Sequence, residues 1–210
     1  MNLTPYVKNL YWELPNLKKY ESPWEIINDL DQIIKYLLSN LPYHEYKIKN
    51  RIAIHKSAII ENNVTLKENT IIGENSIIKS GAYLRDGVYI GKGVNIGANS
   101  EIKQSIIFNK SRIAHLNYVG NSIIGEDVNL EAGSILANHF NEFKNKKIQV
   151  LVDNKIIQTN VTKFGSLIGD ESRIGANSVL NPGTILKRNA VIGRLTHIDQ
   201  LLEYTSKNNF

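Results

Sequence analysis

The 210-residue sequence contains no cysteine and only one methionine. Without cysteine, neither a disulfide nor a thiolate nucleophile can operate, which is typical of a cytoplasmic protein. No apolar run approaches the roughly 18 residues that a membrane-spanning helix needs. The first residues also lack the basic-then-apolar order of a secretory signal. We therefore expect a soluble, cytoplasmic chain with no membrane partner.

The sequence also lacks a concentrated block of one charge, although its formal net charge is +5. The lysines and arginines are spread along the chain rather than gathered on one arm or helix, which argues against a nucleic-acid partner. An ordinary solvated surface accounts for this distribution. If the excess positive charge has a purpose, anionic small molecules such as phosphates suit it better than a duplex does.

What the sequence does contain is an aliphatic residue at every sixth position. The pattern runs through Ile54, Ile60, Leu66, Ile72, Ile78, Leu84, Ile90, Ile96 and Ile102, resumes after two one-residue slips at Ile124, Leu130 and Leu136, and returns at Ile168, Ile174, Leu180, Leu186, Ile192 and Ile198. Neither an α-helix nor an alternating strand has this period. A hexad fits a β-solenoid in which three repeats, roughly 18 residues, complete one triangular coil. We predict a mainly β fold with a solenoid over residues 51–200.

Two segments fall outside the hexads. Residues 1–50 include a predicted helix over 22–41, with Ser22 as N-cap and Glu25 closing a capping box, and we expect this helical segment to cover the open first coil. A partner-binding helix is the alternative. Residues 144–165 read as a β-hairpin that protrudes from the solenoid, since insertions in such folds go to loops. We expect residues 201–210 to form a C-terminal tail, of which 203–210 lie outside the residues that the structure describes below.

The stretch 111–138 departs from the hexad pattern and carries polar residues. It contains "HLNYVG" at 115–120 and "VNLEAG" at 128–133, with "LRDG" at 84–87 and "EIKQ" at 101–104 upstream. Together with the hexads, these motifs resemble the hexapeptide-repeat acyltransferases, and in particular the acetyltransferase domain of the bifunctional glucosamine-1-phosphate N-acetyltransferase / N-acetylglucosamine-1-phosphate uridyltransferase. The resemblance implies a left-handed parallel β-helix, the exception to the usual right-handed crossover.

The resemblance also implies roles for individual residues. His115 and Asn138 match catalytic positions, and the substrate-binding positions are matched by Arg85, Lys103, Tyr118, Asn129, Lys144 and His139. Ala132 matches a position on the acetyl-CoA side, and Ala176, Lys187 and Arg194 are candidates for the CoA arm. No metal site is implied. Arginine and lysine suit a phosphate, and an imidazole can take a proton from an amine near neutral pH before that amine attacks the thioester.

The sequence departs from the family pattern in three ways. The family's Asn-Tyr-Asp-Gly motif appears as "NHFN" at 138–141, so that a histidine replaces the tyrosine, and the predicted hairpin adds residues after it. The nucleotidyltransferase half of the bifunctional enzyme has no counterpart, so we expect no uridylyl transfer. The resemblance implies an acetyl-CoA-dependent N-acetyltransferase, and we expect its acceptor to be glucosamine-1-phosphate or galactosamine-1-phosphate. Another amino sugar phosphate, a nucleotide amino sugar or a small amine are the alternatives.

The resemblance further implies a homotrimer in which His115 of one chain faces Asn138 and His139 of the next. A separate nucleotidyltransferase is a candidate partner. Two rival functions use the same fold. A carbonic anhydrase needs histidines converging on zinc, but the five histidines include no close pair. A non-catalytic scaffold or regulatory partner of a sugar nucleotidyltransferase is the stronger rival, and it predicts no acetyl-CoA binding.

Overall fold

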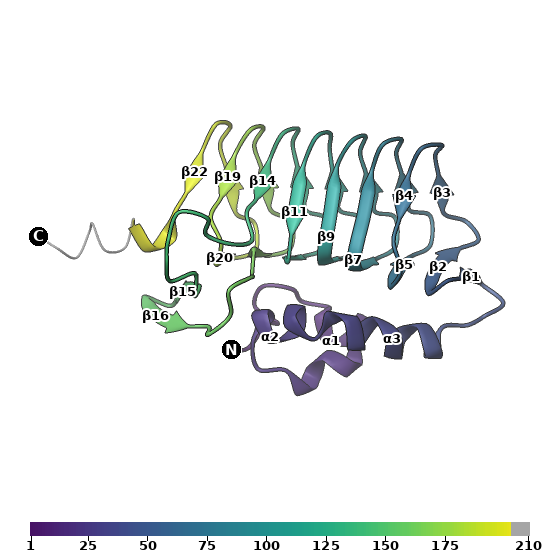
Figure 1. Cartoon of the computed structure of the whole chain (residues 1–210), viewed down its shortest axis with the longest axis horizontal. Coiled ribbons are helices and arrows are strands. Elements are labelled where there is room, and N and C mark those ends of the chain that lie inside the picture. The colour runs from purple at the N-terminus through teal and green to yellow at the C-terminus, as the bar shows by residue number, and fades with distance from the viewer. Residues whose placement is uncertain (203–210) are drawn as a thin grey trace, which may run out of the picture.

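The structure is a computed structural model that describes residues 1–202. Short parallel strands stack along one axis into a left-handed β-helix, and the N-terminal helices lie along one flank of it (Figure 1). The predicted hexads are therefore confirmed as the coils of a solenoid. Among residues 1–202, no helix is long and apolar enough to cross a membrane.

Each coil has three faces, which we name by a feature of each. The Asn129 face comprises β3 (Ile59–Ile60), β6 (Ile77–Ile78), β8 (Asn95–Ile96), β10 (Arg112–Ile113), β13 (Asn129–Leu130), β18 (Arg173–Ile174) and β21 (Val191–Ile192). The Tyr118 face comprises β4 (Thr65–Leu66), the first parts of β7 (Tyr83–Ile90) and β9 (Glu101–Ile107), β11 (Tyr118–Gly120), β14 (Ile135–Leu136), β19 (Val179–Leu180) and β22 (His197–Ile198). The covered face comprises β2 (Ile52–His55), β5 (Thr70–Ile72), the second parts of β7 and β9, β12 (Ile123–Ile124), β17 (Ser166–Ile168) and β20 (Thr184–Leu186). β1 (Tyr46–Lys49) adds an antiparallel strand to β2.

The interior of the coil contains the hexad aliphatics together with buried serines. Ile72, Ile90 and Ile107 are fully buried in one cluster. The Ser76 hydroxyl donates to the Gly91 carbonyl at 2.7 Å and accepts from the Val94 amide at 3.1 Å. Where the small residue of a hexad is a serine, as here, its hydroxyl thus satisfies backbone groups of the next coil.

The N-terminal segment, residues 1–41, contains four short helices. They are α1 (Leu10–Glu13), the 3-10 helix η1 (Pro15–Lys19), α2 (Pro23–Asn28) and α3 (Leu30–Asn40). The predicted single helix over 22–41 is wrong, because it breaks at Asp29. Ser22 is the N-cap of α2, as predicted, but the Glu25 carboxylate accepts from the amide of Glu21 instead of that of Ser22.

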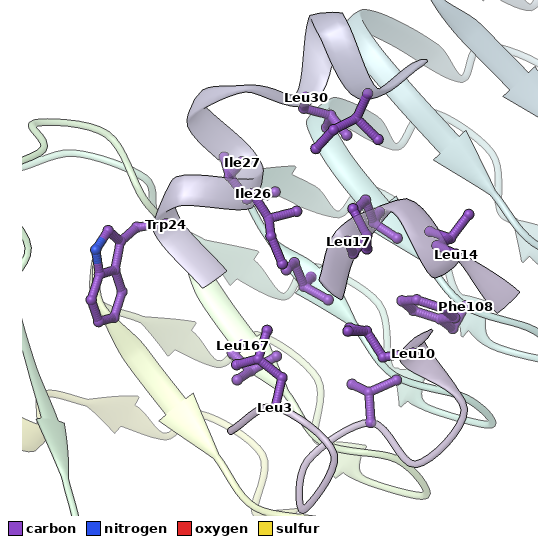
Figure 2. Packing of buried hydrophobic residues seen from close by; sticks show 14 of the residues in the cluster. Leu3, Leu10, Leu14, Leu17, Trp24, Ile26, Ile27, Leu30, Phe108 and Leu167 are labelled. Atoms are coloured by element: carbon purple, nitrogen blue, oxygen red, sulfur yellow. The ribbon is translucent and has the colours of Figure 1, made fainter. Parts of the chain in front are cut away.

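The N-terminal segment packs on the covered face, where the outward side chains are apolar. The buried cluster at this interface combines Leu3, Leu10, Leu14, Leu17, Ile26, Ile27 and Leu30 with Ile71, Ile106, Phe108, Ile123, Leu167 and Ile185 (Figure 2). The segment therefore covers a flank of many coils, whereas the sequence had led us to expect it over the first coil. At that first coil, Ile54, Ile60 and Leu66 remain partly exposed.

The predicted hairpin is present as β15 (Gln149–Val152) paired antiparallel with β16 (Lys155–Gln158). Its turn residues Asp153 and Asn154 have φ of 47° and 59°, which matches the type I′ turn of two-residue hairpins. Ile148 and Val150 join the buried cluster of the covered face. Gly183 permits this packing, because its φ is +88° and a Cβ there would lie 2.5 Å from the Gln149 carbonyl oxygen. The hairpin thus extends the cover toward the last coils.

Candidate functional site

The two one-residue slips in the hexad pattern fall on the same corner, between the Tyr118 face and the covered face. The inward aliphatics Ile102 and Ile107, and again Val119 and Ile124, are spaced five positions apart, where six is usual. Gln104 and Asn121 turn these shortened corners, with φ of 45° and 48°. We call this line of residues the Lys103 corner. Polar side chains from four consecutive coils meet there.

Arg85 and Lys103 bring positive charge to the Lys103 corner from adjacent coils, where their backbones pair in register. The Arg85 guanidinium donates to the Glu101 carboxylate at 2.7 Å and contacts the Asp86 carboxylate at 2.7 Å. The Lys103 ammonium lies 3.8 Å from Asp86. Burial, followed by the charges of Arg85 and Lys163, holds the pKa of Lys103 below its usual value. An anion bound beside Lys103 would oppose both effects and stabilise its charged form.

Lys163 is the residue that sequence reasoning missed at this corner. It follows the hairpin, and its positive charge lowers the pKa of Lys103. Lys144, which was predicted as the second basic contact, lies exposed in the loop before the hairpin, and none of its interactions involves the Lys103 corner within residues 1–202. The hairpin separates Lys163 from the other motifs in the sequence, so no local spacing points to it.

Tyr118 and Asn138 bring hydrogen-bonding groups to the same corner. Burial raises the pKa of the Tyr118 phenol, and Glu101 adds to the effect, while Arg85 and a hydrogen bond with Asn138 oppose it. The Tyr118 ring lies over Gly120, where a Cβ would be 2.7 Å from the phenol oxygen. The glycine of "HLNYVG" is thus required by the position of the tyrosine ring.

A chain of side-chain amides runs through the Lys103 corner. Gln104 Nε2 donates to the Ile27 carbonyl of α2 at 2.9 Å, and Asn121 Nδ2 donates to Gln104 Oε1 at 2.8 Å. Asn138 Nδ2 in turn donates to Asn121 Oδ1 at 2.5 Å, and His139 Nδ1 lies 3.2 Å from Asn138 Oδ1. The structure therefore brings together the predicted residues Arg85, Lys103, Tyr118, Asn138 and His139.

His115 lies on a different corner, between the Asn129 face and the Tyr118 face, which we call the His115 corner. Five residues from successive coils are in register along this corner: Ala98, His115, Ala132, Ala176 and Arg194. The register follows from four backbone hydrogen bonds between neighbouring coils, in which Leu116, Gly133, Asn177 and Leu195 donate to the carbonyls of Ala98, His115, Ala132 and Ala176, respectively. The His115 side chain is exposed, as expected for a residue outside the hexad core. It makes no hydrogen bond or ion pair with any other residue in the range 1–202. Three predicted acetyl-CoA positions thus line up with the predicted base.

A cavity of about 350 Å³ opens beside the C-terminal end of the His115 corner. Asn129, Glu131, Arg173 and Arg194 contribute polar groups to its wall. The Arg194 guanidinium forms two bonds of 2.8 Å with the Glu131 carboxylate, and this pairing lowers the pKa of Glu131. Asn129 therefore lies near the predicted acyl-CoA positions and on a different face from Tyr118.

Lys187 lies on the third corner, between the covered face and the Asn129 face, with its ammonium 3.4 Å from the Asp153 carboxylate of the hairpin. It is separated from Ala176 and Arg194 by a face of the coil. Within residues 1–202, no three histidine, aspartate or glutamate side chains are grouped as metal ligands.

The fold and the hexads define this protein as a hexapeptide-repeat β-helix, and a model of the hexapeptide repeat of succinyl-transferase matches residues 167–193. More specifically, the chain belongs to the GMPPB C-terminal domain family, whose model matches residues 46–157.

Two proteins with similar sequences are bifunctional. The chain is 37% identical over 169 residues to the bifunctional sugar-1-phosphate nucleotidylyltransferase/acetyltransferase of Sulfurisphaera tokodaii, with 77% of this chain and 41% of the relative covered. It is 39% identical over 190 residues to the bifunctional protein GlmU of Methanococcus maripaludis, with 88% and 45% covered. The chain thus spans less than half the length of these relatives.

A solved structure with a similar fold is that of an H141N mutant of perosamine N-acetyltransferase from Caulobacter crescentus in complex with CoA and GDP-perosamine. It shares 16% identity and a TM-score of 0.42, with 78% of this chain and 62% of that chain covered.

Proposed function

We propose that this protein is an acetyl-CoA-dependent N-acetyltransferase that acts on an amino sugar phosphate. One observation carries the proposal: Arg85, Lys103, Tyr118 and Asn138 come from four separate coils and converge on the Lys103 corner. Cations beside neutral hydrogen-bonding groups are what a sugar phosphate requires. The names of the bifunctional relatives, which join sugar-1-phosphate chemistry to acetyl transfer, support the same reading.

In the proposed mechanism, Arg85, Lys103 and Lys163 bind the phosphate, while Tyr118 and Asn138 contact the sugar. His115 accepts a proton from the sugar ammonium, which frees the amine. The amine then attacks the thioester carbonyl, and a backbone N–H stabilises the oxyanion that forms. Collapse of this intermediate breaks the C–S bond, so that the CoA thiolate leaves, and the thiolate takes up a proton as the new amide nitrogen loses one. Acetyl-CoA extends along the His115 corner past Ala132 and Ala176 toward Arg194.

The two corners lie at opposite edges of the Tyr118 face in one chain. We propose that a homotrimer joins them, with His115 of one subunit facing Asn138 and His139 of the next. The amino sugar is glucosamine-1-phosphate or galactosamine-1-phosphate, with a nucleotide amino sugar as the alternative acceptor. Acetyl-CoA is a co-substrate here and leaves as free CoA.

The test is release of free CoA from acetyl-CoA when glucosamine-1-phosphate or galactosamine-1-phosphate is added. His115→Ala should lower kcat by roughly 10²-fold to 10⁴-fold, since it removes the general base. His44→Ala is the matched control, because the His44 side chain is 82% exposed and lies outside the hexads. Turnover by His115→Ala at the native rate would contradict the proposed base.

Two other outcomes separate the alternatives. Binding of acetyl-CoA without turnover of either sugar phosphate would favour a nucleotide amino sugar as acceptor. Neither binding nor turnover would favour a non-catalytic scaffold that works beside a sugar nucleotidyltransferase.

A further inference from the structure

The amide chain at the Lys103 corner has a fixed direction because one of its ends is a backbone carbonyl. The Ile27 carbonyl can only accept a hydrogen bond, so Gln104 must turn its NH₂ group toward it. The break between α2 and α3 places this carbonyl in the last turn of α2, where it also accepts from the Asp29 amide at the end of the helix. The orientation of Gln104 is therefore set by the N-terminal segment.

Each amide then sets the orientation of the next. With its NH₂ group on Ile27, Gln104 presents Oε1 to Asn121, which must donate through Nδ2. Asn121 consequently presents Oδ1 to Asn138, which donates in the same way. Asn138 is buried, and its remaining amide oxygen lies 3.2 Å from His139 Nδ1. From the Ile27 carbonyl oxygen to the His139 imidazole, each contact thus determines which amide atom faces the next residue.

We propose that these hydrogen-bonded amides fix the tautomer of His139, and that Gln104 is the positioning residue that sets their orientation. An amide oxygen only accepts, so Nδ1 of His139 carries the proton and Nε2 keeps its lone pair. His139 then offers a hydrogen-bond acceptor at the corner that holds Arg85, Lys103 and Tyr118. The Nε2 lone pair can accept a hydrogen bond from a hydroxyl or ammonium group of the amino sugar. This last step rests on the proposed function, while the tautomer does not.

The same protein contains a second histidine–asparagine pair with the opposite arrangement. His197 contacts Asn181 Oδ1 through Nε2 at 3.0 Å, and Asn181 Nδ2 donates to the Asp199 carboxylate at 3.0 Å. The same reasoning assigns the proton of His197 to Nε2. Because this pair is not connected to Gln104, it is an internal control.

The experiment is long-range ¹H–¹⁵N NMR of the full chain labelled with ¹⁵N-histidine, above about pH 8, where imidazole is neutral. His139→Gln and His197→Gln identify the two signals. We expect His139 with the proton on Nδ1 and His197 with the proton on Nε2. In Gln104→Ala, His139 should become a tautomer mixture while His197 stays unchanged.

A second substitution should restore the native tautomer. In the double variant Gln104→Ala/Asn121→Asp, the carboxylate can only accept, so it again directs Asn138 Nδ2 toward itself without the anchor. His139 should therefore return to the Nδ1-protonated form. A native His139 with its proton on Nε2, or a Gln104→Ala variant that leaves the His139 tautomer unchanged, would overturn the proposal.

Kinetics separate this inference from the proposed function. Loss of one hydrogen bond through Gln104→Ala should raise KM for the amino sugar phosphate about fivefold, leave KM for acetyl-CoA unchanged, and be reversed in the double variant. An equal rise in both KM values would contradict a positioning role at the acceptor. The expected tautomers in a protein that acetylates no amino sugar would support the fixed tautomer and reject the proposed function alone.

Discussion

At the residue scale, the glycines that follow hexad aliphatics differ in what surrounds them. Gly97 and Gly193 occupy the same repeat position on the His115 corner. A Cβ at Gly97 would lie 1.7 Å from the Ala114 carbonyl oxygen of the next coil, whereas at Gly193 the nearest atom is the Thr196 hydroxyl at 3.5 Å. The close approach of stacked coils thus requires glycine at Gly97 but not at the last coil.

Gly97→Ala should therefore lower the free energy of unfolding by about 1 to 3 kcal/mol, as overpacking does in a rigid core. Gly193→Ala should change it by less than about 0.5 kcal/mol. Urea unfolding of both variants measures the difference. Equal losses of unfolding free energy in the two variants would show that close stacking of the coils is not the reason for glycine at position 97.

The meeting of most candidate residues at the Lys103 corner could be predicted, because short motifs keep their spacing. Arg85, Lys103, Tyr118 and Asn138 each lie within a few residues of an inward aliphatic, so the coil places them in register. Lys163 could not be predicted in the same way. The hairpin separates it from Asn138 along the sequence, while the resumed coil returns it to the same corner.

At the element scale, the hexads predicted the strands, and the gap in the hexads at 144–165 predicted the hairpin, because both signals are local. The position of the N-terminal segment is not local. A clue lies one residue before each inward aliphatic on the covered face, where Ile71, Ile106, Ile123, Leu167 and Ile185 point outward. Outward aliphatics on one face of a solenoid indicate that another element covers it. The break at Asp29 was missed because apolar residues at helical spacing, such as Ile27, Leu30 and Ile34, continue across it.

Two residues of α1 test this packing. Leu10 is 0% exposed against the covered face, and Trp12 is 84% exposed on the same helix. Leu10→Ala should lower the free energy of unfolding by about 2 to 5 kcal/mol through lost burial and a cavity. Trp12→Ala should leave it nearly unchanged. Thermal unfolding followed by circular dichroism compares them, and an unaffected Leu10→Ala would mean that the segment does not pack as described.

At the scale of the whole molecule, the covered face is occupied, so the proposed trimer would have to form through the rest of the surface. The His115 corner exposes Leu116 and Leu195, which are 63% and 79% exposed. Both adopt left-handed backbone conformations, with φ of 58° and 57°, at a repeat position that is Asn99 and Asn177 in other coils. A bulky exposed leucine in this strained conformation favours a contact between chains.

We expect light scattering to give a mass near three times 23.7 kDa for the native chain. Leu116→Asp should reduce it to that of one chain without unfolding, because aspartate tolerates the left-handed conformation better than leucine does. Trp12→Asp, on the opposite flank, should leave the mass unchanged. A native chain that scatters as a monomer would reject the trimer.

The contact between the N-terminal segment and the late coils also determines an order of folding. Residues 1–41 leave the ribosome before the coils do, yet the Tyr6 carbonyl accepts from the Asp170 amide and the Lys8 amide donates to the Asp170 carboxylate, both at 2.9 Å. Each coil needs only its neighbour to form, whereas this contact closes a loop of more than 160 residues. We therefore expect Tyr6 and Lys8 to reach their places only after the late coils form, and until then the late part of the covered face remains open to other nascent chains.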